Sequence, residues 1–250
     1  MTSLADRIID GQLPAGAKLP SERELAHASR LSRPIVREVL RGLQERGLVE
    51  IHPGRGSYVA GPSSITISQS LNSFARTDGV TPKDLIEARA TLERQTAELA
   101  AQRATAADSR KLRELAVAFD RADSLIERAR VDLAFHAMVA KAAHNPVLET
   151  MFGAIAPLVF LLQLRSLSDP AVIAAGAPLH RVVVEAIDAH DPGTAGEAMG
   201  RHVALASELY GDDVDQSLDA ISRRTIATVL GERATLAEVI DQVLGARGLD

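Results

Sequence analysis

The chain has 250 residues, of which 46% are apolar and 24% are charged, and this is enough for two domains with ample cores. It contains no cysteine, which excludes disulfides and thiolate sites, so any metal ion must be held by histidines and carboxylates. The start lacks a basic-then-apolar leader, and we expect no apolar run long enough to span a bilayer. We therefore expect a cytoplasmic protein with no membrane partner.

The net charge of −5 is divided unevenly along the chain. Residues 1–62 contain nine lysines and arginines against seven acidic residues, a balance of +2. The remaining 188 residues contain 19 basic and 26 acidic side chains, a balance of −7. A weakly basic module on an acidic body predicts contact with nucleic acid through one face of one domain.

The first sixty residues show the pattern of short helices followed by a hairpin. After a brief opening helix, Ser21 and Glu24 form a capping box that starts the next helix. A further helix with a serine cap is expected from Ser32, because apolar residues follow it at helical spacing. The segment LVEIHPGRGSYVAG then predicts strand, tight turn and strand, with Arg55 at the tip. Helices followed by such a wing are typical of a winged helix-turn-helix.

The helix from Ser32 carries arginines on the side opposite its apolar stripe. Arg33, Arg37 and Arg41 follow one another at i, i+4 and i+8. Arginine pairs bidentately with guanine edges or phosphates, so this face fits a recognition helix in the major groove of double-stranded DNA. The alternative is a solvated basic face without a ligand, and the wing that follows favours the first interpretation.

The segments IIDGQLPAGAKLPSERELA, SRPIVREVL and GLVEIHPGRGSYV, in this order, resemble the amino-terminal domain of GntR-type bacterial transcription regulators. The resemblance covers nearly all of residues 4–60. It implies that the DNA contacts are Arg23, Ser32, Arg33, Arg37, Gly54 and Arg55. Two positions depart from the family pattern: Arg30 stands where a turn glycine is usual, and Pro34-Ile35 replaces the more usual Thr-Pro.

The rest of the chain is predicted to be helical almost without interruption. We place the DNA-binding domain at 1–62, a linker and lead-in at 63–81, a helical domain at 82–212 and a helical extension at 213–250. Pro after a capping residue marks several helix starts. The six helices of the bundle are expected from 82 to about 100, 107–122, 124–143, 146–165, 170–190 and 194–210, and two more at 218–230 and 236–244. The expected fold is mainly α, with an N-terminal winged helix-turn-helix and a C-terminal antiparallel all-helical bundle.

One carboxylate and three imidazoles in this region have metal-ligand spacing. Asp132 and His136 lie at i, i+4, so both project from one helix face. His180 and His202 are each about ten residues, or roughly 15 Å, from the turn between two helices, so they come level if these helices form a hairpin. Each histidine alone is more often a structural residue than a ligand. Together the four suit Zn²⁺, Ni²⁺ or a similar ion.

The segments RVDLAFHAMVAKAAHNPVL and LHRVVVEAIDAHDPGTAGEAMGRHV resemble the helical effector domain of the fatty-acid-responsive GntR branch, the FCD type, over roughly residues 82–210. In metal-binding members of that branch, an Asp and three His hold the ion. The resemblance implies that the ligands here are Asp132, His136, His180 and His202. It also implies that Arg89 faces the effector cavity and neutralises a carboxylate there. The alternative for Arg89 is a surface ion pair with Glu93.

These patterns predict a ligand-responsive transcription regulator rather than an enzyme. We expect a repressor that binds a two-fold operator as a homodimer and senses a small organic acid at the metal. One alternative is a metal-dependent hydrolase fused to a DNA-binding module, although we identify no further carboxylate near the four ligands to act as general base. Another is an architectural DNA binder with a structural metal.

Overall fold

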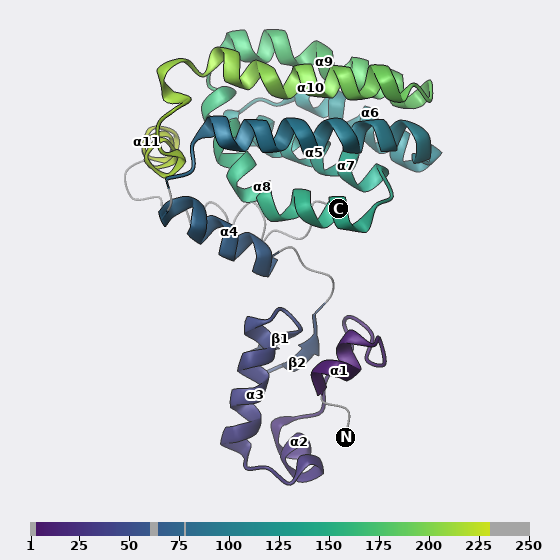
Figure 1. Ribbon diagram of the computed structural model, residues 1–250, viewed down its shortest axis with the longest axis vertical. Helices are drawn as coiled ribbons and strands as arrows, with labels where there is room; N and C mark the ends of the chain where they lie inside the picture. Colours follow the sequence, from purple (N-terminus) through teal and green to yellow (C-terminus); the bar gives the residue numbers. More distant parts are fainter. Residues whose placement is uncertain (1–3, 61–64, 78, 231–250) are drawn as a thin grey trace. The chain divides into compact units, whose positions relative to one another are not determined.

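The chain divides into two compact units, Met1–Gln69 and Ser70–Asp250, in a computed structural model that describes residues 4–60, 65–77 and 79–230 (Figure 1). Both units are built mainly from helices, and the described residues contain one sheet of two antiparallel strands. The predicted mainly helical fold, with a winged module followed by a helical bundle, is confirmed.

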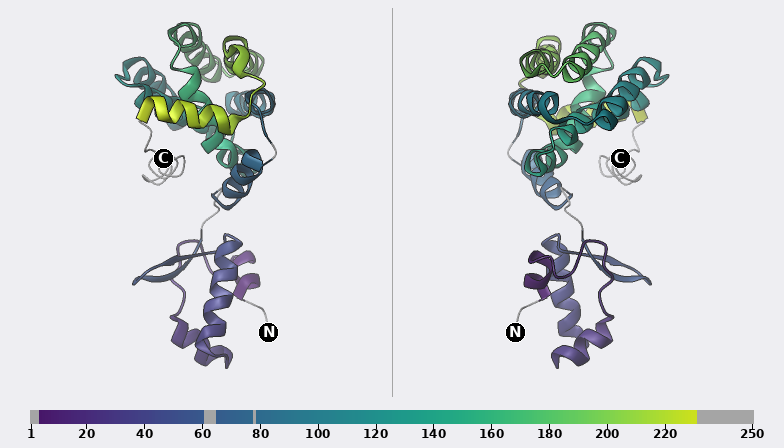
Figure 2. Two further views of the ribbon diagram at one scale, coloured as in Figure 1. Left: turned by 90° about the vertical axis from the view of Figure 1, so that its left-hand side faces the viewer. Right: turned by 90° about the vertical axis from the view of Figure 1, so that its right-hand side faces the viewer.

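The first unit contains a helix-turn-helix followed by a hairpin. Its elements are α1 (Leu4–Ile9), α2 (Glu22–Ser29), α3 (Arg33–Glu45), β1 (Val49–His52) and β2 (Gly56–Val59). The strands pair in the register that sets Val49 opposite Val59, and both of these side chains are buried. They join five further apolar residues from α2, α3 and the preceding loop in a small core. The hairpin therefore packs against α3 by one edge and projects beside it as a wing (Figure 2).

The two helix starts in this unit are capped differently. Ser21 accepts the amide of Glu24 while the Glu24 carboxylate accepts the amide of Ser21, so the predicted capping box is confirmed. Ser32 stands at the N-cap of α3, but its side chain makes no capping hydrogen bond, which corrects the expected serine cap. Pro34 in the first turn of α3 pre-sets the backbone instead. Arg30 ends α2 with a φ of 57°, the left-handed conformation for which glycine is favoured.

A helix that the sequence analysis did not anticipate, α4 (Ile65–Thr77), lies within the segment assigned to linker and lead-in. The Gly, Pro and Ser residues at 61–64 indicated a linker, yet Ile67, Leu71 and Phe74 after them follow the i, i+4, i+7 spacing of a helix. Ala75 near its end is buried in the core of the second unit. The predicted helix at 236–244 lies outside the described residues.

The second unit is a bundle whose helices begin within two residues of the predicted starts. They are α5 (Pro82–Arg103), α6 (Ala106–Arg121), α7 (Leu125–Ala142), α8 (Pro146–Ser166), α9 (Pro170–Asp188), α10 (Pro192–Leu209) and α11 (Leu218–Leu230). Four of these helices carry proline in the first turn after a capping side chain, at Thr81, Asn145, Asp169 and Asp191. Proline fits there because the first amides of a helix have no intrahelical partner.

Helix α5 is central to this unit and packs against α7, α8, α9 and α10 (Figure 1). Its contact with α10 is close because Ala97, Ala100 and Ala101 are fully buried and small. Helices α9 and α10 form a hairpin, and α6 and α7 pack together beside α9 and α5. This arrangement brings the inner faces of α5, α7, α8, α9 and α10 toward one space.

Two of these helices, α8 and α9, are long and apolar enough to cross a membrane when only length and composition are considered. Their mean hydropathies are 1.8 and 1.3, so the expectation that no run is long enough was wrong by this measure. For α8 the reason is its position in the bundle, where its apolar side chains from Leu158 to Leu162 are buried. A helix buried on most sides is apolar all round without a membrane.

Candidate functional site

The candidate DNA-binding face lies on α3 and the wing of the first unit. Val36, Leu40 and Leu43 of α3 are buried, whereas Arg33 and Arg37 on the other side are exposed. This is the amphipathic division that the sequence predicted, because residues at i, i+4 share a face. Two guanidiniums are thereby presented side by side on one surface of the unit.

Glu22, which was not predicted to take part, pairs with the arginines of this face. Its carboxylate accepts two hydrogen bonds from Arg37, from Nε at 3.0 Å and from the terminal nitrogen at 2.8 Å, and lies 3.8 Å from Arg33. The hydrogen bond from Arg37 lowers the pKa of Glu22. This bidentate pair fixes the direction of the Arg37 guanidinium across the turn between α2 and α3.

The remaining predicted DNA contacts are also exposed. Arg23 on α2 and Ser32 before α3 stand at the surface. Gly54 has a φ of 73° at the tip of the wing, where glycine is favoured, and Arg55 follows it with its amide bonded to the carbonyl of His52. All six predicted residues therefore lie on the surface of the first unit, and their contact with DNA is a proposal.

The second unit brings the four predicted metal ligands together from three helices. Asp132 and His136 come from α7, His180 from α9 and His202 from α10. One ligand atom from each of them lies within 4.8 Å of the others. The first three side chains are buried and the fourth is partly buried, so the cluster lies inside the bundle.

The distances within the cluster match those between ligands of one ion. His202 Nε2 lies 3.1 Å from His180 Nε2 and 3.2 Å from His136 Nε2, and Asp132 Oδ1 lies 3.0 Å from His180 Nε2. Two ligands about 2.1 Å from an ion are about 3.0 Å apart at a right angle and about 3.4 Å apart at the tetrahedral angle. Imidazole nitrogens at these separations can hydrogen-bond to one another or share an ion, and the carboxylate of Asp132 beside them adds a fourth donor that suits a cation. The residues present therefore fit a divalent ion.

A fifth side chain, that of Glu93, contacts the ring nitrogen of His136 that points away from the cluster. Glu93 on α5 pairs with Nδ1 of His136, and its other oxygen accepts a 2.6 Å hydrogen bond from Nε of Arg89. A carboxylate at Nδ1 fixes the tautomer of a histidine so that Nε2 is free to bind a metal. The side chains of Arg89 and Glu93 are only 3% and 2% exposed. The alternative of an ion pair between Arg89 and Glu93 is therefore correct about the pairing, but the pair is buried and does not lie at the surface.

The electrostatics of the cluster favour the protonation states that metal ligands need. Burial raises the pKa of Asp132, but its hydrogen bond with His180 and the neighbouring imidazoles outweigh burial and the pKa falls below its ordinary value. Burial and the charges of His180 and His136 lower the pKa of His202. A carboxylate that stays ionised and an imidazole that stays neutral are both ready to coordinate a cation.

A small cavity of about 40 Å³ opens beside the cluster. Asp132 and His202 form part of its wall, and Arg89 lines it as well. Its polar wall is completed by Gln163 and Ser166 of α8, and its apolar wall includes Phe119, Leu162, Val172 and Val203. A carboxylate in this cavity would meet both a metal ion and a buried guanidinium.

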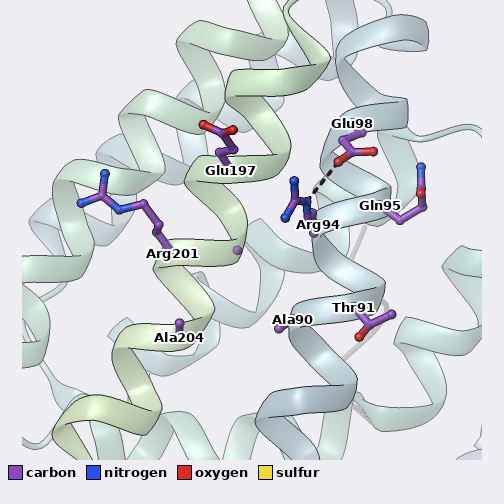
Figure 3. A pocket seen from close by; sticks show the side chains of 9 residues that line it. Ala90, Thr91, Arg94, Gln95, Glu98, Glu197, Arg201 and Ala204 are labelled. Atoms are coloured by element: carbon purple, nitrogen blue, oxygen red, sulfur yellow. Dashed lines mark hydrogen bonds and ion pairs between the residues drawn. The ribbon is translucent and has the colours of Figure 1, made fainter.

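A wider hollow of about 670 Å³ lies on the outer side of α5 and α10 and does not include the cluster (Figure 3). Arg94 pairs there with Glu98, and Glu197 and Arg201 extend from α10. These charges are balanced and solvated, so the larger volume does not identify a binding site.

Two polar residues near the cluster were not predicted from the sequence: Glu93 as a partner of His136, and Gln163. The spacing of Glu93 indicated only a pair with Arg89 at i, i+4. Gln163 carried a usable signal, because it is the one polar residue in the run LVFLLQL of α8. A lone amide in such a run calls for a hydrogen-bonding partner inside the protein.

Comparison with known families assigns both units. The sequence matches the gntR family of bacterial regulatory proteins over residues 1–59 and the FCD domain over residues 84–205. Among solved structures, a Streptococcus agalactiae GntR protein is similar with a TM-score of 0.64 and 27% identity, over 82% of this chain and 95% of that one.

Several similar proteins are named as regulators of transcription or of operons. The Glc operon transcriptional activator of Escherichia coli (strain K12) is 37% identical over 63% of this chain, and the match spans 65% of the activator's length. The protein named "Putative L-lactate dehydrogenase operon regulatory protein", also from Escherichia coli (strain K12), is 34% identical over 87% of this chain and 89% of its own length. LutR of Bacillus subtilis (strain 168), an HTH-type transcriptional regulator, is 33% identical over 61% of this chain and 70% of its own length.

Proposed function

Because this chain belongs to the GntR family of bacterial regulatory proteins and carries an FCD domain, we propose that it regulates transcription in response to a small organic acid bound at a metal ion. The observation that carries the proposal is the buried convergence of one carboxylate and three imidazoles beside a cavity lined by Arg89. The protein works in the cytoplasm, where its DNA is.

Double-stranded operator DNA is bound through α3 and the wing of the first unit. Arg33 and Arg37 read the major groove or its phosphates, while Arg55 at the wing tip reaches the neighbouring backbone. One weakly basic module binds DNA modestly, so the protein acts as a homodimer that presents two copies to a two-fold site. We assign it as a repressor, although one relative is named as an activator.

The ion is held by Asp132, His136, His180 and His202, a donor set that suits Zn²⁺ or Ni²⁺. Bound there, it supplies open coordination positions and positive charge for a carboxylate. Arg89 contributes a second positive charge from the cavity wall. One relative is named for an L-lactate dehydrogenase operon, which agrees with a short carboxylate as the effector.

The regulatory step is a shift between conformations of the dimer. An acid that binds one arrangement of the bundle more tightly changes the population of that arrangement, and DNA affinity changes by the same coupling free energy. The four ligands come from α7, α9 and α10, so an occupied site links three helices whose positions can differ between the two arrangements.

The hydrolase alternative gains no support from the residues around the cluster. A further carboxylate is present after all, since Glu93 contacts His136. Both of its oxygens are engaged, and the charges of Arg89 and His136 outweigh burial and hold its pKa at about 2. A group with that pKa accepts a proton poorly near neutrality, so it is unsuited to act as a general base.

The test uses the full-length zinc-loaded protein and a duplex that it selects from a random pool. Titration with L-lactate or glycolate is expected to change DNA affinity about fivefold or more. His180→Ala should abolish the response to acid while retaining DNA binding. Arg37→Ala should weaken DNA binding about tenfold, with Arg94→Ala as the control.

Removal of the metal by a chelator should also lower the melting temperature of the wild type. Turnover of esters that depends on zinc and His180, or DNA affinity unaffected by any short acid, would contradict the proposal.

A further inference from the structure

Gln163 is a buried polar residue in an apolar stretch of α8. It is 3% exposed, and neither its amide nitrogen nor its amide oxygen has a partner among the described residues. Its neighbours on α8, from Leu158 to Leu164, are otherwise buried apolar residues. Most buried side-chain amides are paired, because an unpaired one has lost its hydrogen bonds to water without replacement. A leucine at this position would avoid that loss.

The position of Gln163 suggests what the amide is for. It lines the 40 Å³ cavity together with Asp132 and His202 of the metal cluster and with Arg89. Ser166, one turn further along α8, also lines the cavity, but its hydroxyl already donates to the carbonyl of Leu162. Gln163 is therefore the polar side chain of the cavity wall with both a donor and an acceptor left to offer.

The size of the cavity limits what it can hold. A water molecule needs about 10–15 Å³ of such volume, so 40 Å³ holds about three waters. A carboxylate with two or three carbons replaces about that number. The remaining wall is apolar, with Phe119 and Val203 among its side chains, and it offers no second cation for a second carboxylate.

We propose that Gln163 determines the specificity of this site by reading a hydroxyl on the second carbon of a short monocarboxylate, so that the protein selects 2-hydroxy acids over the matching unsubstituted acids. The inference rests on the proposed function, in which the carboxylate itself is held by the metal and Arg89. A hydroxyl can donate to the amide oxygen and accept from the amide nitrogen, which satisfies both atoms of Gln163 at once. An acid lacking the hydroxyl leaves that amide unpaired, which is how a polar site rejects an analogue.

The experiment compares two acid pairs on the full-length zinc-loaded protein by calorimetry: glycolate with acetate, and L-lactate with propionate. The wild type should bind each hydroxy acid at least about tenfold more tightly than its partner, the effect of one well-made hydrogen bond. In Gln163→Leu that preference should disappear, with acetate and propionate bound as well as before. Gln95→Leu, which alters an exposed glutamine of the outer groove in Figure 3, is the matched control and should keep the preference.

A second measurement shows that a change in binding does not come from misfolding. Because leucine removes an unpaired buried amide, the metal-free Gln163→Leu protein should melt at the same temperature as the wild type or a few degrees higher. A residue with only a structural role would not combine higher stability with a lost preference for the hydroxyl.

The outcomes separate this inference from the proposed function. If the wild type binds both members of each pair equally, or if Gln163→Leu keeps the preference, the role of Gln163 is wrong while acid sensing at the metal stands. If no acid binds the zinc-loaded wild type, both are wrong. Loss of the preference in Gln163→Leu, with zinc affinity unchanged, supports the inference.

Discussion

Helix α5 carries two Arg–Glu pairs of the same type and spacing, and they behave as different structures. Arg89 and Glu93 are paired at 2.6 Å with their side chains 3% and 2% exposed. Arg94 and Glu98, each five residues further along the helix, are paired at 3.2 Å with side chains 56% and 29% exposed (Figure 3). The first pair faces the cluster of Asp132 and the three histidines and its cavity. The second pair faces the wider hollow on the outer side of α5 and α10.

The difference teaches that the surroundings of an ion pair, rather than its spacing, decide what it does. An exposed i, i+4 pair adds only about 0.3–0.5 kcal/mol, because water solvates both charges. A buried pair has been taken out of water, so removal of one partner leaves a charge uncompensated at a cost of about 3–5 kcal/mol. Glu93 also contacts His136, one of the four proposed metal ligands, whereas Glu98 pairs with Arg94 on the exposed side of the helix.

The largest effect is expected when Glu93 is removed. Glu93→Ala leaves Arg89 buried without its partner, so the free energy of unfolding should fall by about 3–5 kcal/mol. Glu98→Ala should lower it by less than about 0.5 kcal/mol. Urea denaturation of both variants in metal-free buffer measures the two values, and equal losses would remove the distinction between the two faces of α5.

The pH dependence of stability should also separate the pairs. The pKa of Glu93 falls from its ordinary value of 4.5 to about 2, because Arg89 and His136 outweigh the effect of burial. The ionised Glu93 therefore contributes about 3 kcal/mol to the free energy of unfolding. This contribution is complete above pH 4.5 and is lost as the pH falls toward 2.

The measurement is the difference in unfolding free energy between wild type and Glu93→Gln across this range. It should shrink as the pH falls, whereas the difference for Glu98→Gln should stay near zero. If the difference in unfolding free energy between wild type and Glu93→Gln stayed constant down to pH 2, the surroundings of Glu93 would not lower the pKa of its carboxyl group.

A smaller effect is expected on metal affinity. Glu93→Gln keeps the shape of the side chain but weakens the orientation of His136, so zinc should bind about 10–100-fold more weakly. Zinc competition with a chromophoric chelator measures this, with Glu98→Gln as the control. Unchanged affinity in Glu93→Gln would mean that His136 is oriented by its packing alone.

The smallest effect concerns the outer pair itself. A double-mutant cycle with Arg94→Ala and Glu98→Ala should give a coupling energy of about 0.3–0.5 kcal/mol that decreases as salt is added. Thermal unfolding at low and high ionic strength provides the values. A coupling above about 2 kcal/mol would indicate that the groove in Figure 3 shields this pair from water.

Much of the fold could be predicted because its signals are local. Capping side chains followed by proline marked the starts of α5, α8 and α9, and each of these signals acts within one helical turn. Helix α4 was missed because its apolar spacing is diluted by serines and it has no comparable start signal. The direction of Gln163 into a cavity required the packing of several helices, which no local pattern contains.

The sequence by itself determined the kind of protein: a basic winged module, an Ala- and Leu-rich helical bundle, and four side chains whose types and spacings suit a metal ion. Only the tertiary structure decided which of two identical Arg–Glu spacings is buried, that Glu93 stands behind His136, and that a cavity adjoins the cluster. The physical reason is that spacing fixes the face of a helix on which a residue lies, while its solvation depends on the helices that cover that face.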